Sequence, residues 1–248
     1  MTQERVVGIA ASSACSTYSW KDRGRAPAGY IKGMALSFAR SLCRQKNLGG
    51  LASAAALMSK ANTGNASKDA IAQYASTFDS LNMVIDVSGA ETLKSLYTLG
   101  LGLGMRESSG KYCEGYDTSA GTETASEAEA GTFQASYNSM GASPELQKIY
   151  DEYRADSSRC FLSTYKEGVS CKTQSIIGTG AGADYQKFAK SCPAFTAEYT
   201  MALLRVLRAH FGPINRKEAE VIPACNAMLD NVKRYVEEDP RNACADLM

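Results

Sequence analysis

The sequence has almost no net charge and contains no long apolar run. Its 248 residues include 27 Lys and Arg against 26 Asp and Glu, so the formal charge is only +1. Nucleic-acid-binding proteins usually carry a strong basic excess, so this balance argues against that class of partner. The longest weakly apolar stretch, Leu48 to Met58, is too short and too rich in Gly and Ala to cross a bilayer. We therefore expect no nucleic-acid partner and no membrane span.

Histidine is nearly absent, and no two cysteines have C-x-x-C spacing. His210 is the single histidine, beside eight cysteines. Zinc sites need clustered thiolates or imidazoles, so we expect no metal site. The Gly-rich runs 100–104 and 178–182 lack the Gly-Lys-Ser/Thr ending of a phosphate loop, and we expect no cofactor.

The eight cysteines allow two interpretations. Buried free thiols would act as small hydrophobic residues. Eight is nevertheless many for a reduced cytosolic protein of this size, so we favour up to four disulfides formed in an oxidising compartment. The sequence leaves the connectivity open among about 100 possible pairings.

A targeting signal could lie only at the N-terminus. The apolar core there spans six residues, 6–11, which is shorter than a secretory h-region. Ser12 also occupies a position where a lipoprotein signal would have an aliphatic residue. We expect a cytosolic protein, a protein exported without a recognisable signal peptide, or a chain numbered without its leader.

Helical periodicity dominates the chain and predicts a mainly α protein. Six segments have the apolar spacing or capping residues of helices, and Ser67 and Ser143 are the predicted N-caps of the second and fourth. These segments are residues 27–42, 67–82, 90–106, a helix that begins at 143–146, and residues 193–210 and 215–237, the last kinked or interrupted at Pro223.

Two polar segments, 108–142 and 172–184, predict loops, the first with a short hairpin. Gly100, Gly102 and Gly104 indicate tight packing or a break in the third helix. We interpret His210 as a residue at a helix C-terminus, where the dipole favours it.

Glu107 stands where an apolar helix gives way to a polar loop. A carboxylate there faces the negative end of the helix dipole, and apolar neighbours would desolvate it. Both effects raise its pKa, which is what a general acid at neutral pH requires. An exposed terminal Glu is the alternative.

Two short motifs around this residue carry a family resemblance. Glu107-Ser108 closes a helix, and Gly131-Thr132-Phe133-Gln134 follows, with Gln134 27 positions after Glu107. This pattern resembles the lysozyme-like superfamily, in particular lytic transglycosylases and goose-type lysozymes. There a Glu-Ser pair precedes a Gly-aliphatic-Met/Phe-Gln segment, so Thr132 departs from the pattern. The resemblance covers roughly residues 90–140.

The resemblance implies a lysozyme-like helical fold with a small loop or β-hairpin lobe. Residues 86–248 would form the catalytic region, and residues 1–85 an N-terminal helical region, either a separate lobe or integral to the fold. Glu107 would protonate the glycosidic oxygen of a β-1,4 MurNAc–GlcNAc bond. Ser108 would hold a neighbouring loop or a substrate group.

The resemblance also assigns residues beyond the acid. Gly131 would let the backbone approach the sugar, and Gln134 would bind the sugar or hold the loop beneath it. Phe133 would pack under the hairpin rather than touch glycan. Tyr199 is a candidate for the family's later active-site tyrosine, with core packing as the alternative.

A second carboxylate decides between two reactions. Goose-type lysozymes use acidic residues to position water; the first would fall near Asp117, but the second would fall near Ser136, which is not acidic. We favour Asp117 or Glu127 in this role, with Glu123 and Glu129 as loop alternatives. A lytic transglycosylase needs no such residue, because the C6 hydroxyl of its substrate attacks.

We therefore expect a muramidase that acts on peptidoglycan glycan strands. The setting would be a phage lysin or an antibacterial effector acting in the periplasm or cell wall of a target bacterium, with a neutralising immunity protein as a partner. The alternatives are a lytic transglycosylase, a chitinase- or chitosanase-like hydrolase, and a non-catalytic wall-binding structural protein.

Overall fold

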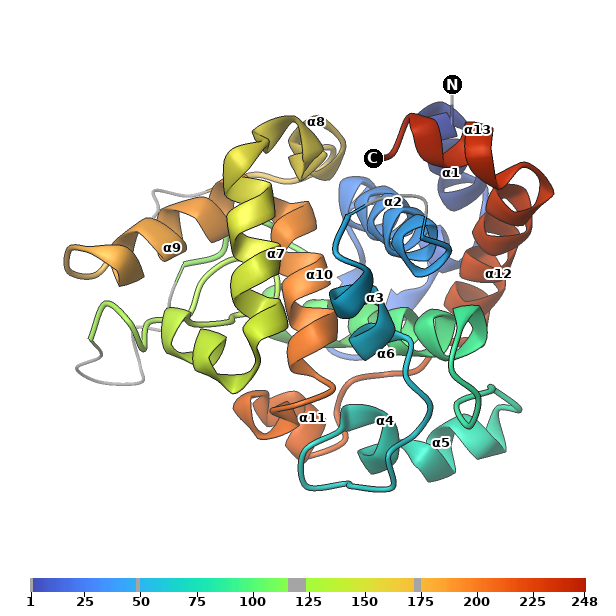
Figure 1. Ribbon diagram of the computed structural model, residues 1–248, viewed down its shortest axis with the longest axis horizontal. Coiled ribbons are helices and arrows are strands. Elements are labelled where there is room, and N and C mark those ends of the chain that lie inside the picture. Colours follow the sequence, from blue (N-terminus) through green and yellow to red (C-terminus); the bar gives the residue numbers. More distant parts are fainter. Residues whose placement is uncertain (1, 48–49, 116–123, 172–174) are drawn as a thin grey trace.

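The computed structural model describes residues 2–47, 50–115, 124–171 and 175–248, and helices dominate them (Figure 1). The mainly α prediction is thus confirmed. Within these ranges the named strands are β1 (Ser19–Trp20) and β2 (Gly24–Arg25), which pair antiparallel. None of the described helices is both long and apolar enough to cross a membrane.

Three buried helices form the centre of the molecule: α2 (Ala28–Gln45), α6 (Ala90–Ser108) and α10 (Pro193–Leu203). α2 contacts both of the others, and every residue of α10 is buried. Hydrophobic residues from all parts of the chain join in one core cluster. The N-terminal region therefore shares its core with the rest of the chain.

The other helices cover this centre on three sides (Figure 1). Beside the two termini lie α1 (Thr2–Ala11), α12 (Pro223–Glu238) and α13 (Pro240–Ala245). The opposite side holds α7 (Pro144–Ala155), α8 (Leu162–Tyr165) and α9 (Ala181–Ser191). The remaining short helices are α3 (Ala52–Met58), α4 (Ala70–Gln73), α5 (Ala75–Ser80) and α11 (Gly212–Asn215). The 3₁₀ turns in the described part of the chain are Ala14–Thr17, Tyr137–Ala142, Ser157–Cys160 and Arg208–His210.

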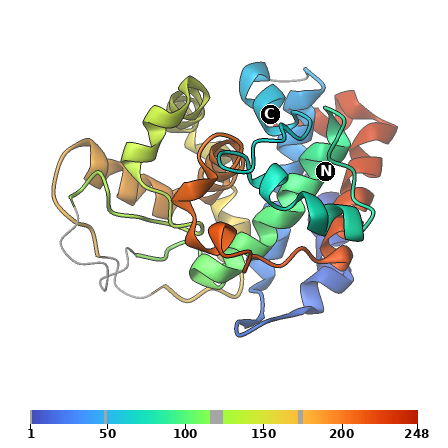
Figure 2. The same ribbon diagram turned by 90° about the horizontal axis from the view of Figure 1, so that it is seen from below.

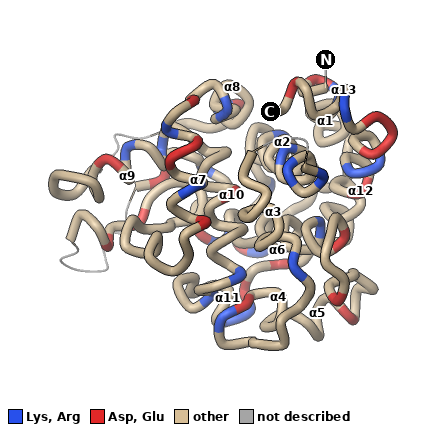
Figure 3. The backbone as a smooth tube through the Cα atoms, viewed as in Figure 1, with Lys and Arg blue, Asp and Glu red and all other residues tan. Residues whose placement is uncertain are grey.

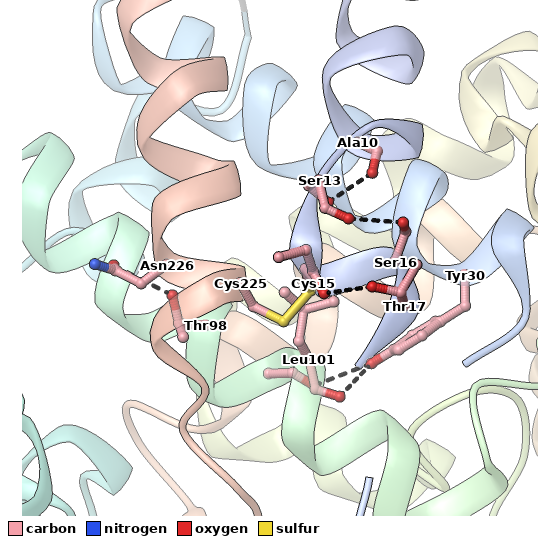
Figure 4. The surroundings of a disulfide bond; sticks show 12 residues. Ala10, Ser13, Cys15, Ser16, Thr17, Tyr30, Thr98, Leu101, Cys225 and Asn226 are labelled. Carbon is pink, nitrogen blue, oxygen red and sulfur yellow. Dashed lines mark hydrogen bonds between the residues drawn. A yellow bond between two sulfur atoms is a disulfide. The ribbon is translucent and has the colours of Figure 1, made fainter. Parts of the chain in front are cut away.

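The glycines of α6 mark close packing and not a break. The helix continues through all three and ends at Ser108. A Cβ at Gly102 would overlap the backbone of Glu220, where residues 216–222 cross the helix (Figure 2). A Cβ at Gly104 would overlap the ring of Tyr30, whose hydroxyl donates to the Leu101 carbonyl at 2.8 Å (Figure 4).

All eight cysteines form disulfides, which confirms the prediction of disulfides. The pairs are Cys15–Cys225, Cys43–Cys244, Cys113–Cys171 and Cys160–Cys192. The first, shown in Figure 4, joins the segment after α1 to the start of α12. Four disulfides are typical of proteins made for an oxidising environment.

Three predicted helices have other bounds in the structure. Residues 67–82 form the two short helices α4 and α5, and the cap is Asp69, whose carboxylate accepts the Ile71 amide. The segment 193–210 is helical only to Leu203. The last helix begins at Pro223, because proline fits the first turn and cannot continue a helix from 215.

The apolar N-terminal run belongs to α1, where Val6 and Ala10 are fully buried. Lys and Arg residues are interspersed with Asp and Glu residues along the chain (Figure 3).

Candidate functional site

The C-terminal end of α6 opens into a pocket of about 280 Å³. Four segments far apart in the sequence build it: the β1–β2 hairpin, the end of α6, the chain before residue 130, and the segment 210–218. Its lining residues are Arg23, Arg106, Glu107, Glu129, His210, Gly212, Pro213, Arg216 and Glu218.

Glu107 contributes a carboxyl group with a strongly raised pKa to this pocket. Burial at the end of α6 raises its pKa to about 8, and the charge of Glu129 adds to the shift. Arg216, Arg23 and Arg106 act in the opposite direction but do not offset these two effects. The pKa of Glu107 is raised, as the sequence predicted. The charge of Glu129 is an additional cause, which the argument from the helix dipole did not include.

The motif at 131–134 forms the tip of a tight hairpin beside α6. The Ala130 amide donates to the Ala135 carbonyl at 3.1 Å, closing an antiparallel bridge. Phe133 is fully buried, and a Cβ at Gly104 would lie 3.0 Å from its ring. The hairpin therefore packs against the helix one turn before Glu107, which places Glu129 at the pocket.

His210 links this hairpin to the segment that follows α10. Its Nε2 donates to the Gln134 carbonyl at 3.2 Å and lies 3.8 Å from Glu129 Oε1. Burial lowers the pKa of the imidazole, which favours the neutral ring. His210 does stand at a helix C-terminus, but it ends the 3₁₀ turn Arg208–His210 and not the long helix predicted from 193, because the chain leaves α10 at Leu203.

Of the two carboxylates favoured from the sequence, only Glu127 lies in the described chain, and it does not line the pocket. Glu127 is exposed and accepts hydrogen bonds from the amide and hydroxyl of Thr124, at 3.0 and 2.8 Å, which lower its pKa. Asp117 and Glu123 lie outside the described residues. Glu129, considered only as an alternative from the sequence, lines the pocket together with Glu107 and Glu218, and its charge acts on Glu107.

Three of the predicted binding residues make bonds within the hairpin and helix. Ser108 Oγ donates to the Gly104 carbonyl at 3.2 Å, and Gln134 Nε2 donates to the Gly131 carbonyl at 2.9 Å. Gly131 has φ of 79°, and a Cβ there would lie 3.0 Å from the Ala189 carbonyl oxygen. Its lack of a side chain thus permits close packing on α9.

Tyr199 lies in the aromatic core. It is fully buried on α10, its hydroxyl is 2.9 Å from Ser139 Oγ, and its ring packs 5.3 Å from that of Phe195. These contacts agree with the core-packing alternative.

Sequence reasoning did not assign Arg23, Arg106, Arg216 or Glu218 to a site. No signal of spacing connects them, because they come from segments that only the fold brings together. Among the described residues, no three His, Cys, Asp or Glu side chains are grouped so as to hold a metal ion. Comparison of the chain with family models, curated proteins and solved structures gave no match.

Proposed function

We propose that this protein is a muramidase that cleaves the β-1,4 bond between MurNAc and GlcNAc in peptidoglycan, with Glu107 as the general acid. The observation that carries the proposal is a carboxyl group at the end of a buried helix whose pKa is raised to about 8. It lies in a pocket with a second carboxyl group, Glu129, and such a pair is what glycoside hydrolysis requires.

The proposed reaction assigns different roles to Glu107 and Glu129. Glu107 would donate its proton to the glycosidic oxygen as the bond to the anomeric carbon breaks. Glu129 would stabilise the developing positive charge on the sugar or accept a proton from the attacking water. His210 would act as a positioning residue, because its hydrogen bond to Gln134 fixes the hairpin that carries Glu129.

The proposed setting is the periplasm or cell wall of a target bacterium. Four disulfides suit such an oxidising location. A phage lysin or an antibacterial effector would act there, and the producer of an effector would need an immunity protein that covers the pocket.

Purified sacculi provide the direct test of the activity. We expect the protein to release soluble muropeptides with reducing MurNAc ends, detected by mass spectrometry. Anhydro ends would identify a lytic transglycosylase instead. Cleavage of chitin oligomers alone would identify a chitinase, and binding to sacculi without release would identify a non-catalytic wall-binding protein.

The pH dependence of the activity follows from the pKa of Glu107. Only the protonated acid can donate, so the rate should fall as the pH rises through about 8. The initial rate of clearing, measured across neutral and alkaline pH at constant ionic strength, tests this. A rate that already falls between pH 4 and 5, where an ordinary Glu titrates at about 4.3, would contradict it.

Glu129 and Glu127 form a matched pair for identifying the second carboxylate. Glu129→Gln should lower the hydrolytic rate by about 100-fold or more, the usual contribution of such a group. Glu127→Gln should change it little, because that side chain is exposed and bonded to Thr124. Full activity of Glu129→Gln with anhydro products would favour transglycosylation over hydrolysis.

The Cys113–Cys171 disulfide should support the site more than the overall fold. The Gly131 amide donates to the carbonyl of Glu114 at 3.0 Å. Glu114 follows Cys113 directly, so the disulfide fixes the segment that holds the hairpin. Replacing both cysteines by Ser should reduce activity several-fold. Removal of Cys43–Cys244, which ties α2 to α13, should instead mainly lower the denaturation midpoint. Equal losses of activity would contradict this division.

A further inference from the structure

Three arginines and two further carboxyl groups surround Glu107 among the described residues of the pocket. Arg23, Arg106 and Arg216 line the pocket together with the carboxyl groups of Glu107, Glu129 and Glu218. When Glu107 is protonated, three guanidinium groups face two carboxylates, and the neutral form of His210 adds no charge. Among the described residues that line the pocket, arginines therefore outnumber ionised carboxylates by one while Glu107 is protonated.

The three arginines differ in their exposure and in the ion pairs that they form within the protein. Arg106 is the least exposed, lying 3.5 Å from Glu218 and 3.7 Å from Asp22. Arg216 makes two bonds to Glu218, at 2.9 and 3.0 Å, and 61% of its side chain remains exposed. Arg23 donates to the Arg106 carbonyl at 2.8 Å and has no ion pair within the described chain.

Arg23 is also held in a defined position. It follows the short strand β1, and its bond caps a carbonyl at the C-terminal end of α6, next to Glu107. A guanidinium group has several donors in a planar fork, so one donor can hold the carbonyl while others face the pocket. This arrangement keeps a cation beside the acid without neutralising it.

We propose that Arg23 and Arg216 select a glycan with a carboxylate next to the scissile bond, and that neutral chitin-type strands bind poorly. Guanidinium groups bind carboxylates through paired, charge-assisted hydrogen bonds. Peptidoglycan offers such a group from two sources, the free lactyl carboxylate of a bare MurNAc or the carboxylates of a stem peptide. The inference deepens the proposed function and rests on it for the nature of the sugar.

Binding of three matched disaccharides tests the proposal without requiring turnover. The probes are GlcNAc–MurNAc with a free lactyl carboxylate, the same disaccharide with a dipeptide stem, and the carboxyl-reduced form. By calorimetry, we expect the protein to bind at least one acidic probe about tenfold more tightly than the reduced form, the effect of about one charge-assisted hydrogen bond. The preferred acidic probe identifies the source of the carboxylate.

Variants connect the preference to the arginines. Arg23→Gln and Arg216→Gln should each reduce it several-fold, and the double variant should remove it. Arg234→Gln, on the exposed face of α12, should keep it intact. Equal binding of acidic and reduced probes, unaltered preference in the double variant, or no binding of any probe would overturn the proposal.

These experiments distinguish failure of the arginine proposal from failure of the proposed muramidase function. Carboxylate-dependent binding without release of muropeptides would reject the muramidase and leave the arginine site standing. Cleavage of peptidoglycan with no loss in the double variant would leave the muramidase standing and reject the role of the arginines.

Discussion

Clearing of cell-wall suspensions by the Glu107→Gln variant should be slower than by the unchanged protein by about 100-fold to 10,000-fold. Glutamine keeps the shape of the side chain but has no acidic proton, and general acid catalysis contributes a factor of that size. The measurement is the initial fall in turbidity at neutral pH, with muropeptide release as a second readout. Glu238→Gln, on the exposed end of α12, is the control and should clear at the normal rate.

The same variant should remain folded. Burial raises the pKa of Glu107 above its value in the unfolded chain, so the folded state binds this proton more tightly. The stability that the proton contributes is complete below the unfolded pKa and is lost as the pH rises through about 8. Gln has no such dependence, so the variant should be at least as stable as the unchanged protein at alkaline pH. Unchanged clearing would remove Glu107 from the acid role.

Arg205→Met should destabilise the fold by about 3–5 kcal/mol, the usual cost of breaking a buried ion pair from one side. Arg205 and Asp69 are both about 1% exposed, and two parallel bonds of 2.9 Å join them. Arg205 also donates to the carbonyls of Met58, Lys60 and Ala61. For a chain of this size we expect the thermal midpoint to fall on the order of 10 °C.

A second Arg–Asp pair provides the control for that experiment. Arg234 and Asp230 lie 3.2 Å apart on the surface of α12, where the arginine is 65% exposed. Arg234→Met should cost less than about 1 kcal/mol, because water screens an exposed pair. Adding Asp69→Asn to Arg205→Met should restore part of the loss, since the uncompensated charge is removed. An equal loss of unfolding free energy in Arg205→Met and Arg234→Met would show that burial does not determine the destabilisation.

Sequence patterns predicted those helices that are specified by neighbouring residues, through apolar spacing or an N-terminal cap. α2, α6 and α7 have apolar spacing or a serine cap, and Ser143 does cap α7 by accepting the Glu145 amide. At α4 the local rule selected Ser67, whereas Asp69 is the cap. Asp69 serves because Arg205 neutralises it in the core, and that contact spans 136 residues. Sequence spacing contains no information on such a partner.

The candidate site was predictable in part for the same reason. Glu107 stood out because a carboxyl group at the end of an apolar helix breaks a local rule. Phe133 and Gln134 fell on the hairpin that the polar segment predicted. Glu129 and His210 could not be chosen, because their meeting depends on how the hairpin and the segment after α10 pack against α6.

Disulfide connectivity could not be predicted from the sequence. The cysteine count indicated disulfides, but Cys15 and Cys43 pair with residues more than 200 positions away. Such pairs follow from the packing of α1, α12 and α13 around α2, which no spacing rule contains.

Titration of the Glu107 carboxyl carbon by ¹³C NMR tests the central claim most directly, because it needs no substrate. With selective labelling and Glu107→Gln to assign the resonance, the account predicts a midpoint near pH 8. A midpoint close to 4.3, the value of an ordinary exposed Glu, would contradict it.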